Sequence, residues 1–198
     1  WAPLKISGGN FESLGTGIHI RHRALGQTHI NGLHLGPCDF GVKAEQPTPP
    51  EDVRPRSQPA SVLNVSQSYI QHRVCGVSTY RTSGRIAISH NEFVPIGETS
   101  GHVSIVGNRK PVTITGNDFG GWMGGYGRTL NAPIWIYDVA EVALTGNVIR
   151  TVGAEHGLRS GLESCDSYAL AGNVVEGKVE KSITFDQIDY GATRALAL

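Results

Sequence analysis

The sequence predicts an all-β fold in which short parallel strands stack in about seven coils, as a right-handed parallel β-helix. Two observations lead to this prediction. An eight-residue block with a strand-like pattern recurs along the chain, and 26 of the 198 residues are glycine while no stretch keeps a helical period. Because this length fills one hydrophobic core, we expect a single domain spanning residues 1–198.

The recurring block is clearest in four copies, at residues 86–93, 112–119, 142–149 and 168–175. Weaker copies begin at residues 4, 33 and 63, so successive blocks start 29, 30, 23, 26, 30 and 26 residues apart. The first and third positions are apolar and the second and fourth are small or polar, which is the period of a strand with one buried face. The unequal intervals predict coils of constant shape with loops of different length.

Each clear block bends at an asparagine, and these residues are Asn91, Asn117, Asn147 and Asn173. Asparagine tolerates the left-handed conformation of a sharp bend, and its amide can bond to the same amide in the next coil. We therefore expect an internal asparagine ladder. The apolar eighth position should stack as a column in the core, formed by Phe11, Phe40, Ile70, Phe93, Phe119, Ile149 and Val175.

A second set of strand-like runs follows the bends, and most of these runs begin with glycine. They lie at residues 17–21, 41–45, 76–80, 101–105, 132–137, 161–165 and 181–186. Two segments interrupt the pattern. Residues 46–60 hold five of the ten prolines and are predicted to loop out of one coil, and residues 120–127 form a glycine-rich loop with two aromatic residues.

Composition excludes several classes of partner and site. Lysine plus arginine and aspartate plus glutamate balance at 17 each, so no basic field favours nucleic acid or an anionic membrane. The three cysteines, Cys38, Cys75 and Cys165, show no CxxC pairing, which argues against a zinc site and a disulfide framework. We expect them to be buried small residues.

Blocks of the form Ile/Val-x-Ile-x-x-Asn-x-Phe, preceded by runs such as residues 17–20 and 132–136, resemble the right-handed β-helix repeat family of the pectate-lyase-like superfamily. The resemblance covers nearly the whole chain. That superfamily includes pectate and alginate lyases, polygalacturonases, mannuronan epimerases, phage tailspikes and surface adhesins. The resemblance thus implies a polysaccharide partner and an extracellular or virion-surface location.

The resemblance does not extend to the polygalacturonase signature. Only residues 85–87 and 101–103 echo its Arg-Ile-Lys and Gly-His-Gly elements, and they do so in reversed order. The Asn-Asn-Glu motif of alginate lyases and the Asp-Pro-His motif of the epimerases are absent as well. The fold is therefore implied more specifically than the activity.

The outward positions of the first strand set are expected to form a flat face of small, uncharged residues. They are Ala87, Ser89, Thr113, Thr115, Ala143, Thr145, Ala169 and Ala171. Three threonines among eight positions are too few for an ice-binding array. We expect this face to be covered or to join copies of the chain in a homo-oligomer.

The outward positions of the second strand set mix aromatic residues, carboxylates and cations. They are His19, Arg21, Lys43, Glu45, Ser78, Tyr80, His102, Ser104, Trp135, Tyr137, Glu163, Thr184 and Asp186. Polysaccharide sites use this mixture, because rings stack on sugars while polar groups hold their substituents. We expect Glu45, Trp135, Tyr137 and Glu163 to contact sugar. Trp122 and Tyr126 would form one wall of the site, and the proline-rich segment the other.

β-Elimination of a uronate needs a cation for the C6 carboxylate, a base for the C5 proton and a donor to the leaving oxygen. The candidates for these roles are Arg21, Lys43, His19 and Tyr80. Hydrolysis instead needs two carboxylates ~5 to 9 Å apart, and Glu45 has no such neighbour in the pattern. A lyase or related depolymerase acting on an acidic polysaccharide is therefore the predicted activity.

Two alternatives stay open. Charges such as Arg21, Lys43 and Glu45 are also what the solvated face of any solenoid carries. No cofactor or metal motif is present, and the candidates for a calcium site are Asp138, Glu163 and Asp166. The second function is a non-catalytic β-helix segment of a phage tailspike, tail fibre or surface adhesin. No capping helix is predicted at either end, which favours a segment of a longer chain or an oligomer.

Overall fold

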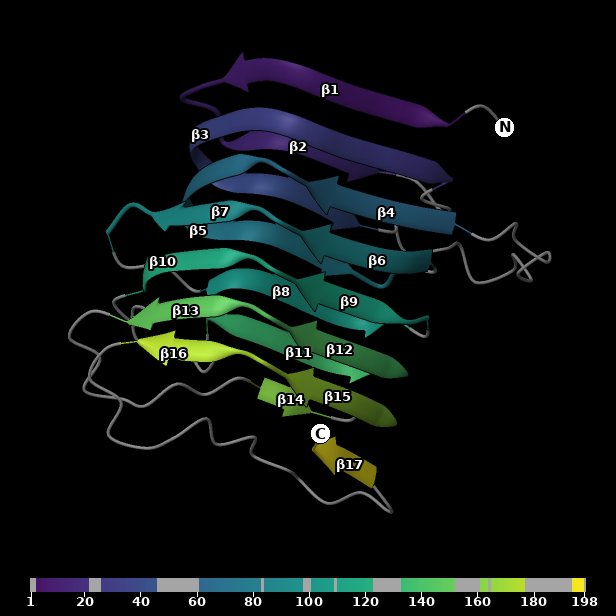
Figure 1. Ribbon diagram of the computed structural model, residues 1–198. Coiled ribbons are helices and arrows are strands. Elements are labelled where there is room, and N and C mark those ends of the chain that lie inside the picture. The colour runs from purple at the N-terminus through teal and green to yellow at the C-terminus, as the bar shows by residue number, and fades with distance from the viewer. Residues whose placement is uncertain are drawn as a thin grey trace.

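The computed structural model of the protein describes residues 3–21, 26–45, 61–82, 84–97, 101–108, 110–122, 133–151, 161–163, 165–176 and 194–197. These residues form strands joined by bends and irregular segments and contain no helix, so none of their segments is a helix able to cross a membrane. Their strands join into one large parallel sheet that curls around an apolar core (Figure 1). The all-β prediction is confirmed.

The strands stack in three columns, within which each strand is hydrogen-bonded in parallel to the next (Figure 1). Column 1 contains β1 (Leu4–Phe11), the start of β3 (Gln27–Glu45), β4 (Ser61–Ser66), β6 (Gly84–Ser89), β9 (Val112–Thr115), β12 (Glu141–Thr145), β15 (Ser167–Ala171) and β17 (Arg194–Ala197).

Column 2 contains the end of β1, the middle of β3, the start of β5 (Tyr69–Tyr80), β7 (Glu92–Pro95), β10 (Asp118–Trp122), β13 (Val148–Thr151) and β16 (Val174–Glu176). Column 3 contains β2 (Thr16–Arg21), the ends of β3 and β5, β8 (Gly101–Asn108), β11 (Ile134–Val139) and β14 (Gly161–Glu163). The bend divides each later block into a strand of column 1 and a strand of column 2. The strands therefore form three sets, whereas the sequence predicted two.

The register confirms the repeat for six of the seven blocks, beginning at residues 4, 63, 86, 112, 142 and 168. The predicted block at residues 33–40 is wrong. Thr28 pairs with both Leu4 and Leu63, so the second block spans residues 28–35. The error has a physical cause, since Leu33 takes the position of the ladder asparagine there and its alternation with Leu35 imitates the start of a strand.

The bend is made by the fifth position of the block rather than by the asparagine at the sixth. This fifth residue has positive φ in all seven blocks, at Gly8 (62°), Gly32 (64°), Gln67 (51°), His90 (55°), Gly116 (63°), Gly146 (62°) and Gly172 (60°). Glycine adopts this conformation without steric cost, whereas Gln67 and His90 adopt it although residues with a side chain prefer negative φ. The asparagine is thereby free to act through its side chain.

The asparagine ladder is confirmed. Asn117 donates from its side-chain amide to Oδ1 of Asn147 at 3.0 Å, and that same oxygen accepts the backbone N–H of Asn117 at 3.0 Å. Asn91 bonds to Asn117 in the same way, and Asn147 bonds to Asn173. Ser68 ends the ladder by donating its backbone N–H to Asn91. The buried bends are thus hydrogen-bonded from coil to coil.

The core is built by the inward positions of the three columns. Phe93 and Phe119 lie fully buried and stacked, with ring centroids 4.8 Å apart, as members of the predicted eighth-position column. Phe40 was placed in this column by the prediction, and that placement is wrong. The position belongs to Leu35, while Phe40 pairs with Thr16 and is only half-buried.

Several predicted segments fall outside the described residues. These are residues 46–60, residues 123–127 of the glycine-rich segment and residues 181–186. The first residues of the glycine-rich segment, 120–122, belong to strand β10 rather than to a loop. Cys38 and Cys75 are buried as predicted, Cys165 is half-buried, and none of the three forms a disulfide.

Candidate functional site

The outward side chains of column 3, here called the column 3 face, form two rows in register. The inner row is His19, Lys43, Ser78, Ser104 and Trp135. The outer row is Arg21, Glu45, Tyr80, Val106 and Tyr137. Column 3 lies behind columns 1 and 2 in the view of Figure 1. Charged residues and aromatic residues therefore share one surface, as predicted, with the charges towards the N-terminal strands.

His102 is not on this face, and its predicted outward position is wrong. It is fully buried beside Val103, because the backbone N–H groups of both residues donate to the carbonyl of Pro133, at 2.8 and 3.1 Å. Two consecutive residues opposite one acceptor make a β-bulge, which turns both side chains inward. After the bulge the alternation shifts, so that Ser104 and Val106 face outward.

Glu45 is the centre of a cluster of charges on the column 3 face. Its carboxylate lies 2.9 Å from Nε2 of His19, 3.0 Å from Nζ of Lys43 and 3.7 Å from Nε of Arg21. The side chain of Arg21 is 69% exposed, against 31% for Lys43. Arg21 is therefore the cation most accessible to a ligand, while Lys43 is held by the carboxylate.

The cluster stabilises the ionised form of Glu45. Hydrogen bonds from Lys43 and then from His19 lower the pKa of the Glu45 carboxyl below its ordinary value. The carboxylate also orients the ring of His19, since Nε2 is engaged and only Nδ1 remains for another partner. A histidine that is held by a carboxylate in this way can serve as a general base.

The aromatic residues occupy the same face as the charges. Tyr80 is 46% exposed and Tyr137 is 40% exposed, and the two lie in one row with Val106 between them. Trp135 is half-buried and faces outward because Ile134 and Ile136 on either side of it are buried, as predicted. The guanidinium carbon of Arg81, which the sequence reasoning missed, lies 5.1 Å from the centroid of the Tyr80 ring.

Part of the predicted site lies outside the residues and side chains that the structure describes. The backbone of Glu163 pairs with Tyr137 in column 3, and the backbone of Trp122 ends β10, but their side chains are not described. Tyr126 and the proline-rich segment fall outside the described residues. Asp138 and Asp166, two of the calcium candidates, both lie near the thiol of Cys165. Among the described residues no group of three or more His, Cys, Asp or Glu side chains is placed to hold a metal ion.

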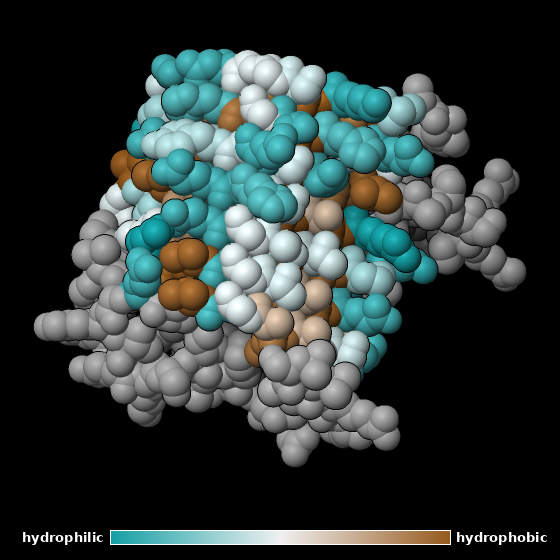
Figure 2. Space-filling view, in the orientation of Figure 1, coloured by the Kyte–Doolittle hydropathy of each residue, from teal (hydrophilic) through white to brown (hydrophobic). Residues whose placement is uncertain are grey.

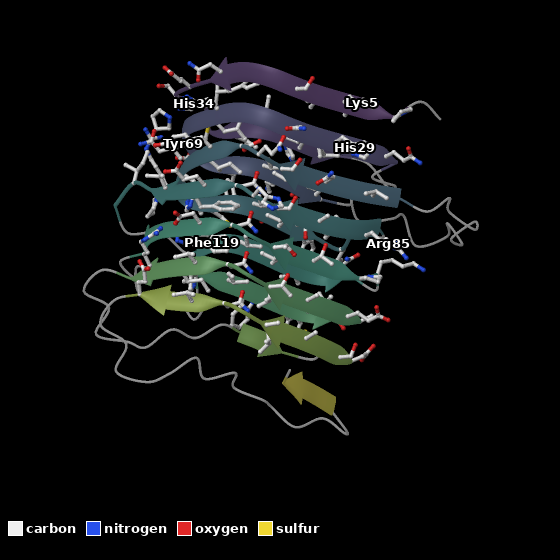
Figure 3. The ribbon with its side chains drawn as sticks, in the orientation of Figure 1. Lys5, His29, His34, Tyr69, Arg85 and Phe119 are labelled. Atoms are coloured by element: carbon white, nitrogen blue, oxygen red, sulfur yellow. The ribbon has the colours of Figure 1, made fainter. Side chains whose placement is uncertain are left out.

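At the predicted outward positions, column 1 carries small, uncharged side chains over its later strands, and the hydroxyls of Thr115 and Thr145 lie 3.0 Å apart. Figure 2 shows pale, weakly polar residues over much of the lower part of the visible face and more hydrophilic residues towards the top. Near that top Lys5 and His29 lie one above the other (Figure 3) and line a depression of about 430 Å³. This depression is separate from the column 3 face.

Column 2 carries contacts that the sequence reasoning did not anticipate. His34 and Tyr69 meet edge to face, with ring centroids 4.7 Å apart (Figure 3). Arg150 forms ion pairs with Asp118 and with Glu176. In the observed register His34, Tyr69 and Asp118 occupy the seventh position of the repeat, and Arg150 and Glu176 occupy the ninth. The His34–Tyr69 pair was missed because the prediction placed the second block in the wrong register.

Comparison of the chain with protein-family models, with curated proteins and with solved structures found no match.

Proposed function

We propose that the chain is a right-handed parallel β-helix that binds an acidic polysaccharide along its column 3 face. The observation that supports this most strongly is the in-register row of Arg21, Glu45, Tyr80, Val106 and Tyr137, which aligns accessible cationic and aromatic side chains along the stack. Aromatic rings bind the apolar faces of sugars, and an exposed guanidinium binds carboxylates. A linear anionic polymer matches a linear array of these groups.

The spacing of the row suits an extended ligand. Neighbouring strands in a sheet lie about 4.8 Å apart, so Tyr80 and Tyr137, two strands apart, are separated by about 10 Å along the stack. Val106 between them has a small, half-buried side chain, which leaves room for a sugar ring above it. The row therefore offers two stacking platforms, with Arg21 further along the same line.

β-Elimination is the chemistry that this cluster suits. His19, oriented by Glu45, is the base that would remove the C5 proton of a uronate, and Arg21 would hold the C6 carboxylate. The hydroxyl of Tyr80, whose backbone pairs with that of Glu45, would donate its proton to the leaving oxygen. These roles need no metal ion, and a bound calcium ion would have to replace the cations in neutralising the substrate carboxylate.

A non-catalytic β-helix of a tailspike, tail fibre or adhesin is the second candidate. The internal neutralisation of the cluster favours it, because Glu45 already occupies the anion position that a substrate carboxylate would take between Lys43 and His19. In that case the face would recognise a glycan through Tyr80, Tyr137 and Arg21 without changing it. Both candidates share the same binding surface and differ in turnover.

Binding is tested by titrating the protein with polygalacturonate, alginate and a neutral glucan by calorimetry. The proposal predicts saturable binding to an acidic polymer, weakened at least tenfold by Tyr137→Ala and by Arg21→Ala. Tyr69→Ala on column 2 and Arg85→Ala on column 1 are matched controls, because they remove the same side chains from other faces and should leave binding unchanged. Equal weakening by a variant and its control would contradict the site.

Turnover is tested separately, by following the absorbance of the unsaturated product during incubation with the same uronate polymers. A lyase gives product with wild type and none with His19→Ala, while the Arg85→Ala control keeps full activity. Saturable binding without product would leave the recognition proposal standing and remove the lyase. Absence of binding to every acidic polymer would remove both.

A further inference from the structure

His72 in β5 and His102 in β8 form a pair in the interior of the protein. Both side chains are fully buried, and Nε2 of His72 lies 3.0 Å from Nδ1 of His102. Their rings meet edge to face, with centroids 5.1 Å apart. The pair lies where the chain turns from column 2 into column 3, since His72 pairs with Pro95 of column 2 and Cys75, just beyond it in β5, pairs with Gly101 of column 3.

The hydrogen bonding of this pair is incomplete. Nδ1 of His72 and Nε2 of His102 are both buried without a hydrogen-bond partner in the structure. Each neutral imidazole carries one N–H, so whichever ring donates to the other, one N–H and one lone pair remain unsatisfied. A buried polar atom without a partner is costly, and the pair therefore already lowers the stability of the core when both rings are neutral.

The groups around the pair are neutral. Phe93 of β7 and Phe119 of β10 pack against His102, with centroids 6.1 and 5.5 Å away, and Phe93 also packs against His72 at 6.5 Å. The titratable neighbours are the thiols of Cys75, which contacts the carbonyl of His102 at 3.7 Å, and Cys38, whose backbone pairs with that of His72. Burial raises the pKa of both thiols, and of Cys75 to about 12.

The charged side chain that adjoins His72 in the sequence is paired with another charged side chain instead of with the histidines. Arg73, next to His72, forms an exposed ion pair with Asp39 at 3.4 Å. No described Asp or Glu side chain hydrogen-bonds either ring, so an added proton would meet no anion. Burial lowers the pKa of His72 to about 3, and burial followed by repulsion from His72 lowers the pKa of His102 well below its ordinary value.

We propose that the His72–His102 pair is an acid-sensitive switch, which keeps β5 and β8 closed on the Phe93–Phe119 stack at neutral pH and releases them when a ring takes up a proton. Buried histidines that must charge in acid are a recognised basis for such transitions. Because β5 and β8 supply Tyr80, Ser104 and Val106, the release would break the column 3 face between its cationic and aromatic parts. The switch itself does not depend on what that face binds.

The direction and size of the effect follow from linkage. The unfolded chain binds protons at its histidines below a pH of about 6.5, whereas the folded pair does not until far lower pH, so stability is lost as the pH falls through this window. Between pH 7.5 and 5 each such histidine raises the unfolding equilibrium constant about 30-fold, and two raise it several hundred-fold.

The first test uses the wild-type protein and needs no substitution. Histidine ring nitrogens are followed by NMR while amide hydrogen exchange is measured at pH 7.5 and 5. We expect the rings of His72 and His102 to stay neutral for as long as β5 and β8 are closed. The amides of β5 and β8 should nevertheless lose protection at pH 5, because the opened state takes up protons at this pair. If all rings titrate near pH 6.5 while β5 and β8 stay protected, the proposal is wrong.

The second test measures urea unfolding as a function of pH in His72→Phe, which keeps an aromatic ring against Phe93 and removes one proton site. The acid-dependent increase in the unfolding constant should fall from several hundred-fold to about 30-fold. His34→Gln, at an exposed ring, is the control and should keep the wild-type dependence. An unchanged dependence in a folded His72→Phe would overturn the proposal, and if that variant does not fold the wild-type titration decides.

Discussion

The side-chain amide of Asn117 and Oδ1 of Asn147 lie 3.0 Å apart on successive coils, and this bond repeats from Asn91 to Asn173. The same Asn117 amide also donates to the carbonyl of Ile88 at 2.9 Å, one coil in the other direction. Asn91, Asn117 and Asn147 each tie three coils together in this way, through bends that are otherwise closed to water.

Replacing Asn117 by alanine should lower the free energy of unfolding by about 3 kcal/mol, because it leaves buried groups of Asn91 and Ile88 without their partners. Chemical denaturation measures this loss. Asn31→Ala is the control, since Asn31 is exposed on column 1, and it should change stability by less than about 0.5 kcal/mol. Equal effects of the two substitutions would show that the ladder adds nothing specific.

Gly76 allows two coils to approach closely at the turn into column 3. A Cβ at this position would lie 2.5 Å from the ring of Phe93 and 2.8 Å from the carbonyl of His102. Gly76→Ala should therefore lower the free energy of unfolding by about 2 kcal/mol or more through overpacking. Gly15→Ala meets nothing closer than 3.9 Å and serves as the control with little expected effect. Thermal unfolding of both variants would show whether the destabilisation comes from the close contact at Gly76 or from any replacement of glycine by alanine.

The carboxyl group of Glu45 should titrate at lower pH than an ordinary glutamate. Its pKa is lowered by Lys43 first and by His19 second, so Lys43→Met should raise the NMR titration midpoint of Glu45. A carboxyl group whose pKa is lowered by folding stabilises the fold at pH values above its ordinary pKa. This stabilisation disappears as the pH falls through the lowered pKa. A midpoint that does not move in Lys43→Met would contradict the ion pair at 3.0 Å.

The thiols of Cys75 and Cys165 should resist modification. Burial raises the pKa of Cys75 to about 12 and that of Cys165 to about 11, so little thiolate is present near neutral pH. Labelling with a thiol reagent, read by mass spectrometry in increasing urea, should modify Cys75 only as the chain unfolds. Rapid modification of Cys75 without urea would place it outside the core.

The sequence predicted the parts of the fold that each block encodes locally. The asparagines at the sixth position and the apolar residues around them predicted both the ladder and the stack of Phe93 on Phe119. The second block was misplaced because Leu33 replaces the ladder asparagine. Gly32, at the left-handed fifth position, was the signal that would have fixed its register, since glycine also holds that position in four of the other blocks.

The features that could not be predicted arise between segments distant in the sequence. His102 turns inward because of a bulge formed with Pro133, which no local pattern at residues 101–105 shows. The residues of the cationic cluster were placed on one face by alternation, but their convergence on Glu45 depends on side-chain conformations across two strands. Only the three-dimensional arrangement shows that Arg21 is the most accessible cation of this cluster.

The central claim is that equivalent positions of successive blocks lie directly beside one another. Cysteines placed at Thr113 and Ala143, partners in β9 and β12, test it through disulfide formation. Adjacent partners lie within the Cα separation that a disulfide requires, whereas Thr113 and Ala169 are two strands, about 10 Å, apart. The stacked register predicts an intramolecular bond in Thr113→Cys/Ala143→Cys and none in Thr113→Cys/Ala169→Cys. A bond in the second pair only, or in neither, would contradict it.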